Sequence, residues 1–292
     1  MESVFFSIVI PTYNRAHLIA KTLNSVLNQT YSNFEIIVVD DGSKDNTQEI
    51  VASFTDKRIY YFKKENGERA AARNFGVHKA KGDYINFFDS DDLMYPHHLQ
   101  TAFQFIQTKK PSWFHLGYDF KDVEDKVIKN FESFDDSIDK KIIFDNRLSC
   151  NGVFIRKDVM NQNLFHENRI LASSEDWELW IRLLAQYPLL FDNTITSSVV
   201  NHDARSLFTI PADKVIARDE LLIQLLKSNA LVQKLYQNQF NKFIAERYSF
   251  FMLCLSEQKR KREVFSWAYR AFKIYPPILF TKRYLASIKN SL

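Results

Sequence analysis

The first hundred residues alternate between short apolar runs and stretches with helical spacing. Runs rich in β-branched and aromatic residues predict strands, and they end where polar, turn-forming residues begin. The order strand, helix, strand, helix, strand is typical of a doubly wound α/β domain. The predicted strands cover residues 6–10, 34–40, 59–62 and 84–88, and helical patterns occupy about 16–27, a stretch from near 46, and a small-residue stretch within 66–76.

Three carboxylates follow the apolar run that begins at residue 84. Asp89, Asp91 and Asp92 would repel one another and lose hydration at the rim of a sheet unless a cation or a network of donors compensated them. Oxygen ligands suit Mg²⁺ or Mn²⁺, which one or two carboxylates commonly hold together with substrate phosphates. The alternative is a capping cluster, in which Ser90, Asp91 or Asp92 caps the next helix.

A second acidic pair ends the run at residues 34–40. Asp40 and Asp41 precede a glycine, and the first strand ends in the segment Pro-Thr-Tyr-Asn at 11–14. In an open parallel sheet, ligands bind beyond the carboxyl ends of the strands, so these strand ends point at one crevice.

Two arginines lie near the same predicted crevice. Arg69 and Arg73 are four residues apart in the helical stretch, so they share one face, where a guanidinium can meet a nucleotide base or a phosphate. The alternative is an ordinary amphipathic helix with exposed arginines.

Residues 173–184 predict a helix with a serine cap and a Trp-rich apolar face. Glu175 and Asp176 fall in its first turn, where the helix dipole alone favours acidic side chains. The stretch 148–156 predicts a further strand, in which Gly152 either allows a sugar to approach the backbone or marks a bulge. The charged stretch from about 109 to 146 predicts exposed turns and an edge hairpin.

Four segments together resemble the family 2 inverting glycosyltransferases of the GT-A fold. They are Val-Ile-Pro-Thr-Tyr-Asn (9–14), Val-Val-Asp-Asp-Gly-Ser (38–43), Asn-Gly with Ala-Ala-Arg-Asn-Phe-Gly (66–76) and Phe-Phe-Asp-Ser-Asp-Asp (87–92). The resemblance covers roughly residues 5–205, most strongly before residue 100. It implies a mixed central sheet flanked by helices, a nucleotide-diphosphate sugar donor, Mg²⁺ or Mn²⁺, and a glycan or lipid-linked glycan acceptor.

The resemblance also implies roles for individual residues. The nucleotide pocket would contain Pro11, Thr12, Tyr13, Asp40, Asp41, Arg73 and Asp89, with Asp41 at the base and Arg73 over the nucleotide. Asp91 would contact the metal directly, Asp89 would contact the ribose or the metal through water, and Asp92 would cap the following helix.

The resemblance also concerns the second half of the catalytic domain. In the resembled family, the second acidic residue of a Glu-Asp pair there is the general base, and it corresponds to Asp176. Glu175 would lie beside the diphosphate or the acceptor. The segment 199–206 resembles one in which relatives place a histidine near the diphosphate. His202 is therefore a supplementary metal or phosphate ligand in this interpretation, and Arg205 contacts the diphosphate.

The carboxyl-terminal third changes character, with helical spacing from residue 212 onward. We expect a GT-A catalytic domain over 1–210, with a nucleotide-binding half to about 100 and an acceptor-binding half from 101, followed by a helical region over 211–292. Residues 257–292 contain nine Lys or Arg against two Glu, interleaved with aromatic residues. Such a segment favours an anionic membrane surface; the alternative is a solvated helix whose aromatic side chains pack on the domain.

Composition excludes several other classes. At 292 residues, 46% hydrophobic and 25% charged, the chain is neither disordered nor fibrous. Two cysteines, Cys150 and Cys254, offer no disulfide framework and favour a reducing compartment. The N-terminus lacks the basic region of a signal peptide, and no run of about 18 apolar residues occurs. We therefore expect a cytoplasmic protein, peripheral at the inner face of the cell membrane.

These patterns favour transfer of a sugar from a UDP-sugar, with no nucleic acid partner. Two alternatives remain open: a nucleotidyltransferase that releases pyrophosphate, and a non-catalytic nucleotide- or glycan-binding module. The first lacks a glycine-rich basic loop after the first strand, and a dinucleotide-dependent oxidoreductase is disfavoured because no G-x-G-x-x-G follows a strand.

Overall fold

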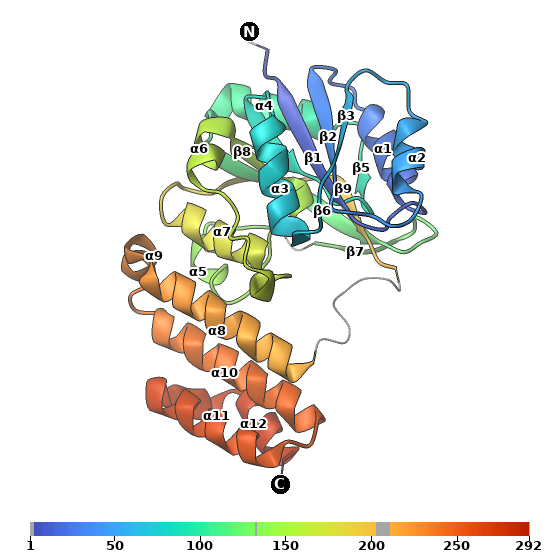
Figure 1. Ribbon diagram of the computed structural model, residues 1–292. Helices are drawn as coiled ribbons and strands as arrows, with labels where there is room; N and C mark the ends of the chain where they lie inside the picture. The colour runs from blue at the N-terminus through green and yellow to red at the C-terminus, as the bar shows by residue number, and fades with distance from the viewer. Residues whose placement is uncertain (1–2, 132, 203–210, 292) are drawn as a thin grey trace. The chain divides into compact units, whose positions relative to one another are not determined.

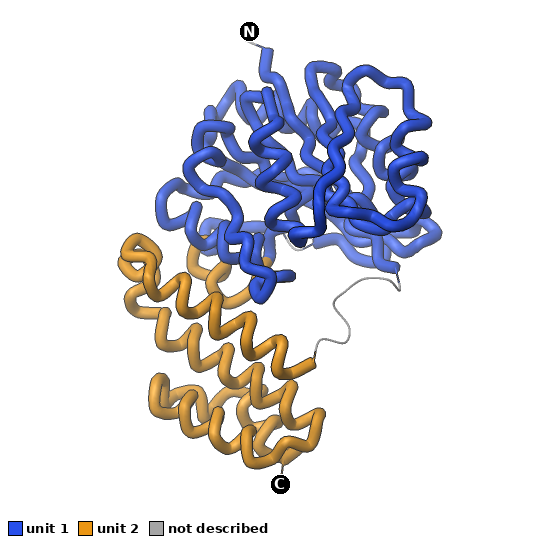
Figure 2. The backbone as a smooth tube through the Cα atoms, viewed as in Figure 1, with its two compact units in different colours: residues 1–138, 147–204 blue, residues 139–146, 205–292 orange. Residues whose placement is uncertain are grey.

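The computed structural model describes residues 3–131, 133–202 and 211–291 (Figure 1). Two compact units make up the chain, one from residues 1–138 and 147–204 and the other from 139–146 and 205–292 (Figure 2). The sequence predicted that the helical region begins at residue 211, whereas the contacts also assign residues 139–146 to the second unit. The roles of the halves 1–100 and 101–210 stay a prediction.

The described strands of the first unit form one mixed sheet in the order β3-β2-β1-β4-β8-β6-β9-β5, with β7 beside β6. The strands are β1 (Phe6–Thr12), β2 (Phe34–Asp40), β3 (Ile59–Lys63), β4 (Tyr84–Phe87), β5 (Leu93–Met94), β6 (Trp113–Lys121), β7 (Val127–Asn130), β8 (Val153–Arg156) and β9 (Leu190–Val200). The first four strands in this order are parallel, and β8 runs antiparallel to both β4 and β6. The expected mixed sheet is confirmed.

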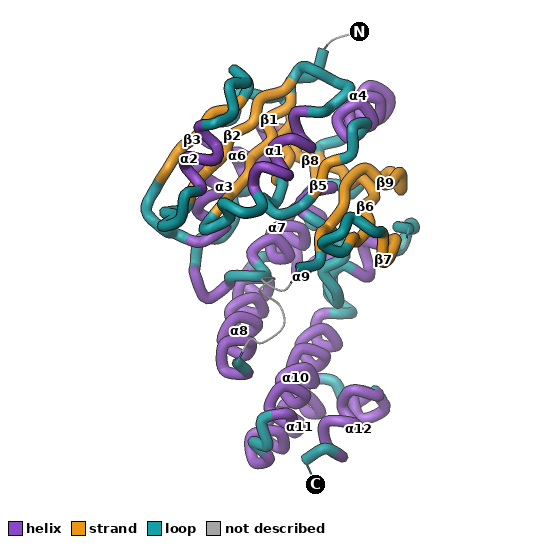
Figure 3. The backbone as a smooth tube through the Cα atoms, turned by 90° about the vertical axis from the view of Figure 1, so that its right-hand side faces the viewer, coloured by secondary structure: helices purple, strands orange, loops and turns teal. Residues whose placement is uncertain are grey.

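Helices cover both faces of this sheet (Figure 3). The helices are α1 (Ile19–Leu27), α2 (Thr47–Ala52), α3 (Glu68–Lys79), α4 (His98–Lys109), α6 (Lys157–Gln162) and α7 (Glu175–Leu184). Because side chains alternate along a strand, Ile8 and Ile10 share a core with Leu23 of α1 and Leu99 of α4. Val9 faces α3, where a Cβ added to Gly76 would lie 2.3 Å from it. The strands are therefore buried on both faces, as expected for parallel strands.

Three local expectations had different outcomes. The expected hairpin is formed by β6 and β7, but β6 is not an edge strand, because it also pairs with β8 and β9. The strand expected over 148–156 is shorter, because a 3₁₀ turn, η1 (Cys150–Gly152), precedes β8. No helix directly follows the acidic cluster, since β5 intervenes and α4 has its N-cap at His97. The capping interpretation of Ser90, Asp91 and Asp92 is therefore wrong.

The second unit consists of helices with a core of their own. They are α8 (Ala212–Ser228), α9 (Ala230–Leu235), α10 (Phe240–Glu257), α11 (Lys261–Ile274), the 3₁₀ turn η3 (Pro276–Phe280) and α12 (Lys282–Lys289). Most of the short helix α5 (Ile138–Lys141) also belongs to this unit, through the segment 139–146. Phe251 and Met252 of α10 and Val264 of α11 are fully buried together. The expected helical region is confirmed. Within the described ranges, no helix is long and apolar enough to cross a bilayer.

Candidate active site

The carboxyl ends of β1, β2 and β4 meet at one edge of the sheet. Thr12 of β1 lies opposite Asp40 of β2, and β4 pairs with β1 on the other side. The loops that follow are joined: Asn14 N donates to Ser43 Oγ at 2.9 Å, and Lys44 N donates to Asn14 Oδ1 at 2.8 Å. The strand ends that the sequence expected to share a crevice thus lie side by side.

Asp40 and Asp41 differ in their surroundings. Asp40 is fully buried and accepts hydrogen bonds from Ser43 N, at 2.7 Å, and from the Tyr61 hydroxyl, so it holds the loop. Burial raises the pKa of Tyr61, and its bond to Asp40 raises it further. Asp41 accepts from Lys64 Nζ at 2.7 Å and from Gly67 N at 2.9 Å. The Asp41 carboxylate is therefore hydrogen-bonded to the turn before α3, whereas Ser43 and Tyr61, which donate to the Asp40 carboxylate, lie elsewhere.

Three other residues of the predicted nucleotide pocket lie at the carboxyl end of β1 or directly after it. Pro11 and Thr12 are buried, and Tyr13 is exposed. The Thr12 hydroxyl oxygen is buried without a hydrogen-bond partner in the part of the chain that the structure describes. A buried hydroxyl without a partner is unfavourable, so this position is one where a ligand atom would be stabilised.

Arg73 joins the end of β4 to the start of α7. Its guanidinium lies 3.0 Å from Asp89 Oδ1 and 2.9 Å from Glu175 Oε1, and 5.4 Å from the centre of the Phe165 ring. Arg73 and Glu175 are both buried. Burial lowers the pKa of Arg73, but the surrounding thiol and carboxylates outweigh it and raise that pKa. The alternative of exposed arginines is wrong for Arg73 and holds for Arg69.

Asp176 lies next to this ion-paired group. Its Oδ1 accepts from Trp177 N at 2.7 Å, so part of its charge stabilises the start of α7. Its Oδ2 lies 3.9 Å from Cys150 Sγ. Burial raises the pKa of the Cys150 thiol well above its usual value, while Arg73 opposes this, so the thiol remains a donor. Ser174 is the N-cap residue, but its side chain makes no capping hydrogen bond.

Asp91 lies between a guanidinium and an imidazole. Arg15 Nε is 3.3 Å from its Oδ2, and His202 Nε2 is 3.1 Å from the same oxygen. The sequence placed His202 and Arg205 near this end of β9; His202 is there, and Arg205 lies outside the described residues.

The donor set around Asp91 fits a divalent cation that a substrate also ligates. The described residues contain no group of three or more His, Cys, Asp or Glu side chains suited to a metal. However, Asp91 Oδ2 and His202 Nε2 lie 3.1 Å apart, so these two side chains would be the ones to hold such an ion. Such a pair leaves several positions for diphosphate oxygens and water.

Asp92 does not cap a helix. It is buried and accepts from Val200 N at 2.8 Å and from Asn151 Nδ2 at 2.7 Å. Asn151, in turn, accepts from Asp89 N at 3.0 Å. The third carboxylate therefore fixes η1 and the end of β9 against the acidic loop, and the expected capping role is wrong.

Sequence reasoning missed four residues that shape this site: Arg15, Lys64, Cys150 and Asn151. Arg15 directly follows the Pro-Thr-Tyr-Asn segment, so its position beside a strand end was a usable signal. Asn151 stands next to Gly152, where an added Cβ would lie 2.4 Å from the Leu116 carbonyl oxygen. That close approach of the backbone is one reason for the glycine, and the approach of a sugar stays a prediction.

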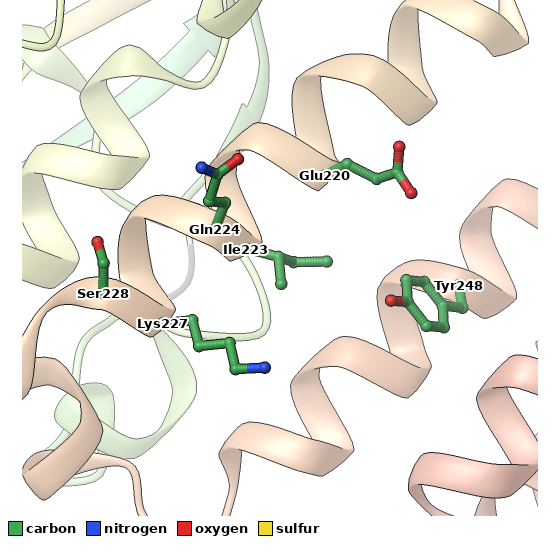
Figure 4. A pocket seen from close by; sticks show the side chains of 6 residues that line it. All are labelled: Glu220, Ile223, Gln224, Lys227, Ser228 and Tyr248. Atoms are coloured by element: carbon green, nitrogen blue, oxygen red, sulfur yellow. The ribbon is translucent and has the colours of Figure 1, made fainter.

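A separate pocket of about 420 Å³ lies in the helical unit (Figure 4). Its lining residues are Glu220, Ile223, Gln224, Lys227, Ser228 and Tyr248. None of them belongs to the four motif segments, so the pocket is unrelated to the carboxylate site.

Comparison with known proteins identifies the family. The model described as "Glycosyl transferase family 2" matches residues 7–158, from β1 to the start of α6. The chain belongs to glycosyl transferase family 2. A glucosyltransferase of this kind from Escherichia coli, the UDP-Glc:alpha-D-GlcNAc-diphosphoundecaprenol beta-1,3-glucosyltransferase WfgD, is 30% identical over 63% of this chain and 71% of its own length.

Other relatives are longer than this family 2 chain. An uncharacterized glycosyltransferase of Rickettsia bellii is 38% identical over 61% of this chain but only 26% of its own length. The chain thus spans about a quarter of that relative.

Solved structures share the whole fold. Staphylococcus aureus TarS 1-349 in complex with UDP-GlcNAc aligns with a TM-score of 0.63 and 20% identity, covering 98% of this chain and 89% of that one. The mannosyltransferase PcManGT of Pyrobaculum calidifontis, in complex with GDP-Man and Mn²⁺, aligns with a TM-score of 0.61 and 14% identity, covering 99% and 86%. The fold is therefore GT-A, as the motifs implied.

Proposed function

We propose that this family 2 protein is a metal-dependent, inverting glycosyltransferase that moves a hexosyl or N-acetylhexosaminyl group from a UDP-sugar to a glycan or lipid-linked glycan. The observation that carries this proposal is the ion-paired group around Arg73, which brings Asp89 at a strand end to Glu175 and Asp176 at a helix start. In this proposal the donor site and the base are therefore adjacent. The name of WfgD, with its UDP-Glc donor and diphosphoundecaprenol-linked acceptor, supports the donor and acceptor classes.

The donor nucleotide lies along the ends of β1 and β2 in this proposal. Tyr13 is exposed there and offers a ring for the base to stack on, and the Thr12 hydroxyl gains the partner it lacks. Asp41 accepts from the base through Oδ2, because Lys64 Nζ and Gly67 N both donate to Oδ1. TarS supports a uridine nucleotide because it was crystallised with UDP-GlcNAc and with UDP.

Asp91 and His202 would hold the metal ion, with Asp89 close by, and Arg205 would contact the diphosphate. A bound divalent cation supplies Lewis acidity that stabilises negative charge on a leaving diphosphate. The PcManGT complex with Mn²⁺ supports this choice. Calorimetry should detect Mn²⁺-dependent binding of UDP by the wild-type chain and its loss in Asp91→Ala. Equal UDP binding by the two proteins would contradict the metal assignment.

Asp176 acts as general base in this proposal. Its Oδ1 accepts from Trp177 N and its Oδ2 lies 3.9 Å from Cys150 Sγ. The carboxylate takes the acceptor hydroxyl proton. The acceptor oxygen then forms its bond to the anomeric carbon as the bond to the diphosphate breaks on the opposite side, which inverts the centre. Positioned proton transfer of this kind contributes roughly 10²–10⁴-fold to a rate.

Substituting Asp176→Asn tests the base. We expect kcat for transfer to fall by roughly 10²–10⁴-fold, while UDP affinity in calorimetry stays that of the wild type, because Asn keeps the hydrogen bond from Trp177. Asp158→Asn, which removes an exposed carboxylate in α6, is the matched control. A kcat near the wild-type value in Asp176→Asn would refute the assigned base.

The product that is released distinguishes a glycosyltransferase from a nucleotidyltransferase and from a non-catalytic binding module. A transferase releases UDP, a nucleotidyltransferase releases pyrophosphate, and a binding module binds the sugar nucleotide without turnover. Because donor and acceptor are identified only by class, a panel of UDP-sugars screened by thermal shift with Mn²⁺ is the first experiment. A cytoplasmic location is part of the same proposal.

A further inference from the structure

The carboxyl-terminal helices carry an unusual concentration of exposed apolar side chains. The described residues include fourteen large apolar side chains that are exposed, and six of them lie between residues 265 and 285. They are Phe265, Tyr269, Phe272, Leu279, Phe280 and Leu285. Exposed apolar side chains that are concentrated in one segment indicate an interaction surface more often than scattered single residues do.

The structure separates core aromatic residues from exposed ones. Trp267 of α11 is buried, with its ring centre 5.0 Å from that of Phe251, and Ile278 of η3 is also buried. For these two residues, packing on the protein is the correct interpretation. Tyr269 and Phe280 are different, because 66% and 86% of their surfaces are exposed.

The exposed residues of α11 form a continuous strip. Phe265, Tyr269 and Phe272 are spaced by four and three residues, so they share one helical face. Arg262 precedes the strip by one turn and Lys273 follows Tyr269 by one turn, so both cations lie on that side. The buried residues of α11, such as Val264 and Trp267, occupy the other face and pack into the core of the second unit.

The surrounding charge is positive and uncompensated. Arg262, Lys273, Lys282 and Lys289 have no carboxylate partner among the residues that the structure describes. Glu263 is paired with Arg260 and does not neutralise them. Aromatic rings in a row, flanked by unpaired cations, are the pattern of helices that lie in the interface of an anionic bilayer.

We propose that the aromatic strip of α11, together with Phe280 and its neighbouring lysines, docks on an anionic lipid surface. The proposal adds to glycosyl transfer and does not depend on it. A second copy of the chain is a poorer partner, because two faces of the same positive charge repel each other. An acidic protein surface would satisfy the cations but gives no reason for Phe280 to project into solvent.

Flotation of the full chain with vesicles tests the docking, without donor or acceptor. We expect binding to phosphatidylcholine vesicles that contain phosphatidylglycerol and little binding to phosphatidylcholine alone. Binding should weaken at high salt, because salt screens the attraction. Arg262→Gln with Lys273→Gln should weaken binding roughly thirtyfold, since each basic residue contributes about a fivefold factor near such a surface. The matched control, Lys57→Gln with Lys109→Gln, removes two exposed charges from the first unit and should bind normally.

A second set of variants tests the aromatic strip. Phe265→Ser, Tyr269→Ser and Phe272→Ser together should abolish flotation, whereas Leu231→Ser with Leu235→Ser, two exposed leucines of α9, should not. A Phe280→Trp variant should be quenched by lipids with brominated acyl chains.

Three results would overturn the lipid surface as partner. The first is equal binding to vesicles with and without phosphatidylglycerol. The second is an unquenched tryptophan at position 280. The third is self-association in the ultracentrifuge that the strip variant abolishes, which would assign the face to a second copy. Sugar transfer is measured separately with a water-soluble acceptor, so failure of either proposal leaves the other standing.

Discussion

Two buried histidines should make the first unit unstable in mild acid. His98 and His115 are fully buried, and burial lowers the pKa of each to about 3. His98 Nδ1 meets Thr196 Oγ1 at 2.7 Å, and His115 Nε2 accepts from Ser149 N at 3.2 Å. A second proton on His115 would have to bind Nε2 and would break the hydrogen bond from Ser149 N. His98 Nε2 and His115 Nδ1 make no hydrogen bond within the described ranges.

The sign and size of the effect follow from linkage. In the unfolded chain each imidazole binds a proton below pH 6.5, its ordinary pKa, while the folded chain keeps both rings neutral until the pH approaches 3. Stability is therefore full above pH 6.5 and is lost as the pH falls. Between pH 7 and pH 5 each histidine removes about 2 kcal/mol and the pair about 4 kcal/mol, which is a large part of a typical 5–15 kcal/mol.

The measurement is urea unfolding from pH 7 to pH 5, followed by tryptophan fluorescence. A Trp267→Phe background restricts the signal to the first unit, because the remaining tryptophans, Trp113, Trp177 and Trp180, all belong to it. This separation matters because a chain of two units need not unfold in a single step.

Near-isosteric substitutions isolate each ring. His115→Gln keeps an acceptor for Ser149 N, and His98→Asn keeps a group that can meet Thr196, so each variant removes the proton site and retains the hydrogen bond. Each should reduce the pH dependence by about 2 kcal/mol over this range, and exposed His78→Gln should leave it unchanged. If the wild type and both core variants lost the same stability between pH 7 and pH 5, the reasoning would be refuted.

Three further substitutions test buried contacts by urea unfolding. Arg73→Met leaves the Glu175 carboxylate buried without its partner and should destabilise the first unit by about 3–5 kcal/mol, part of which a second change, Glu175→Leu, should restore. Gly152→Ala forces a Cβ against the Leu116 carbonyl and should destabilise the first unit by about 1–3 kcal/mol. Asp219→Leu removes the carboxylate that is ion-paired with Arg218 and Arg247 in the helical unit. It should destabilise that unit by about 3–5 kcal/mol, measured by the fluorescence of the tryptophan of α11.

The parallel half of the sheet was predictable because local sequence specifies it. Strands β1 and β2 are buried at every position, so they appear as continuous apolar runs bounded by turn residues. Strand β5 could not be found in this way. It has two residues and exists because Leu93 and Met94 pair with Ser198 and Ser197 of β9, a partner more than a hundred residues away.

The same distinction applies to the site. Carboxylates at strand ends are visible in the sequence, but their partners are not: Glu175 is 102 residues from Arg73, and His202 is 111 residues from Asp91. Asp89, Asp91 and Asp92 look alike in the motif. Only their distant neighbours make Asp92 a buried structural residue and leave Asp91 between Arg15 and His202.

The formal charges of the site explain why a divalent cation suits it. Asp89 and Asp91 repel each other, and each is ion-paired with a different arginine. Arg73 pairs with Asp89, and Arg15 pairs with Asp91. Glu175 and Asp176 add two further carboxylates to the same region, so four negative charges face two guanidinium groups. A diphosphate would bring more negative charge into a partly buried place, where charges interact strongly. In the proposed mechanism, a divalent ion held by Asp91 and His202 would bring two positive charges that offset this negative charge.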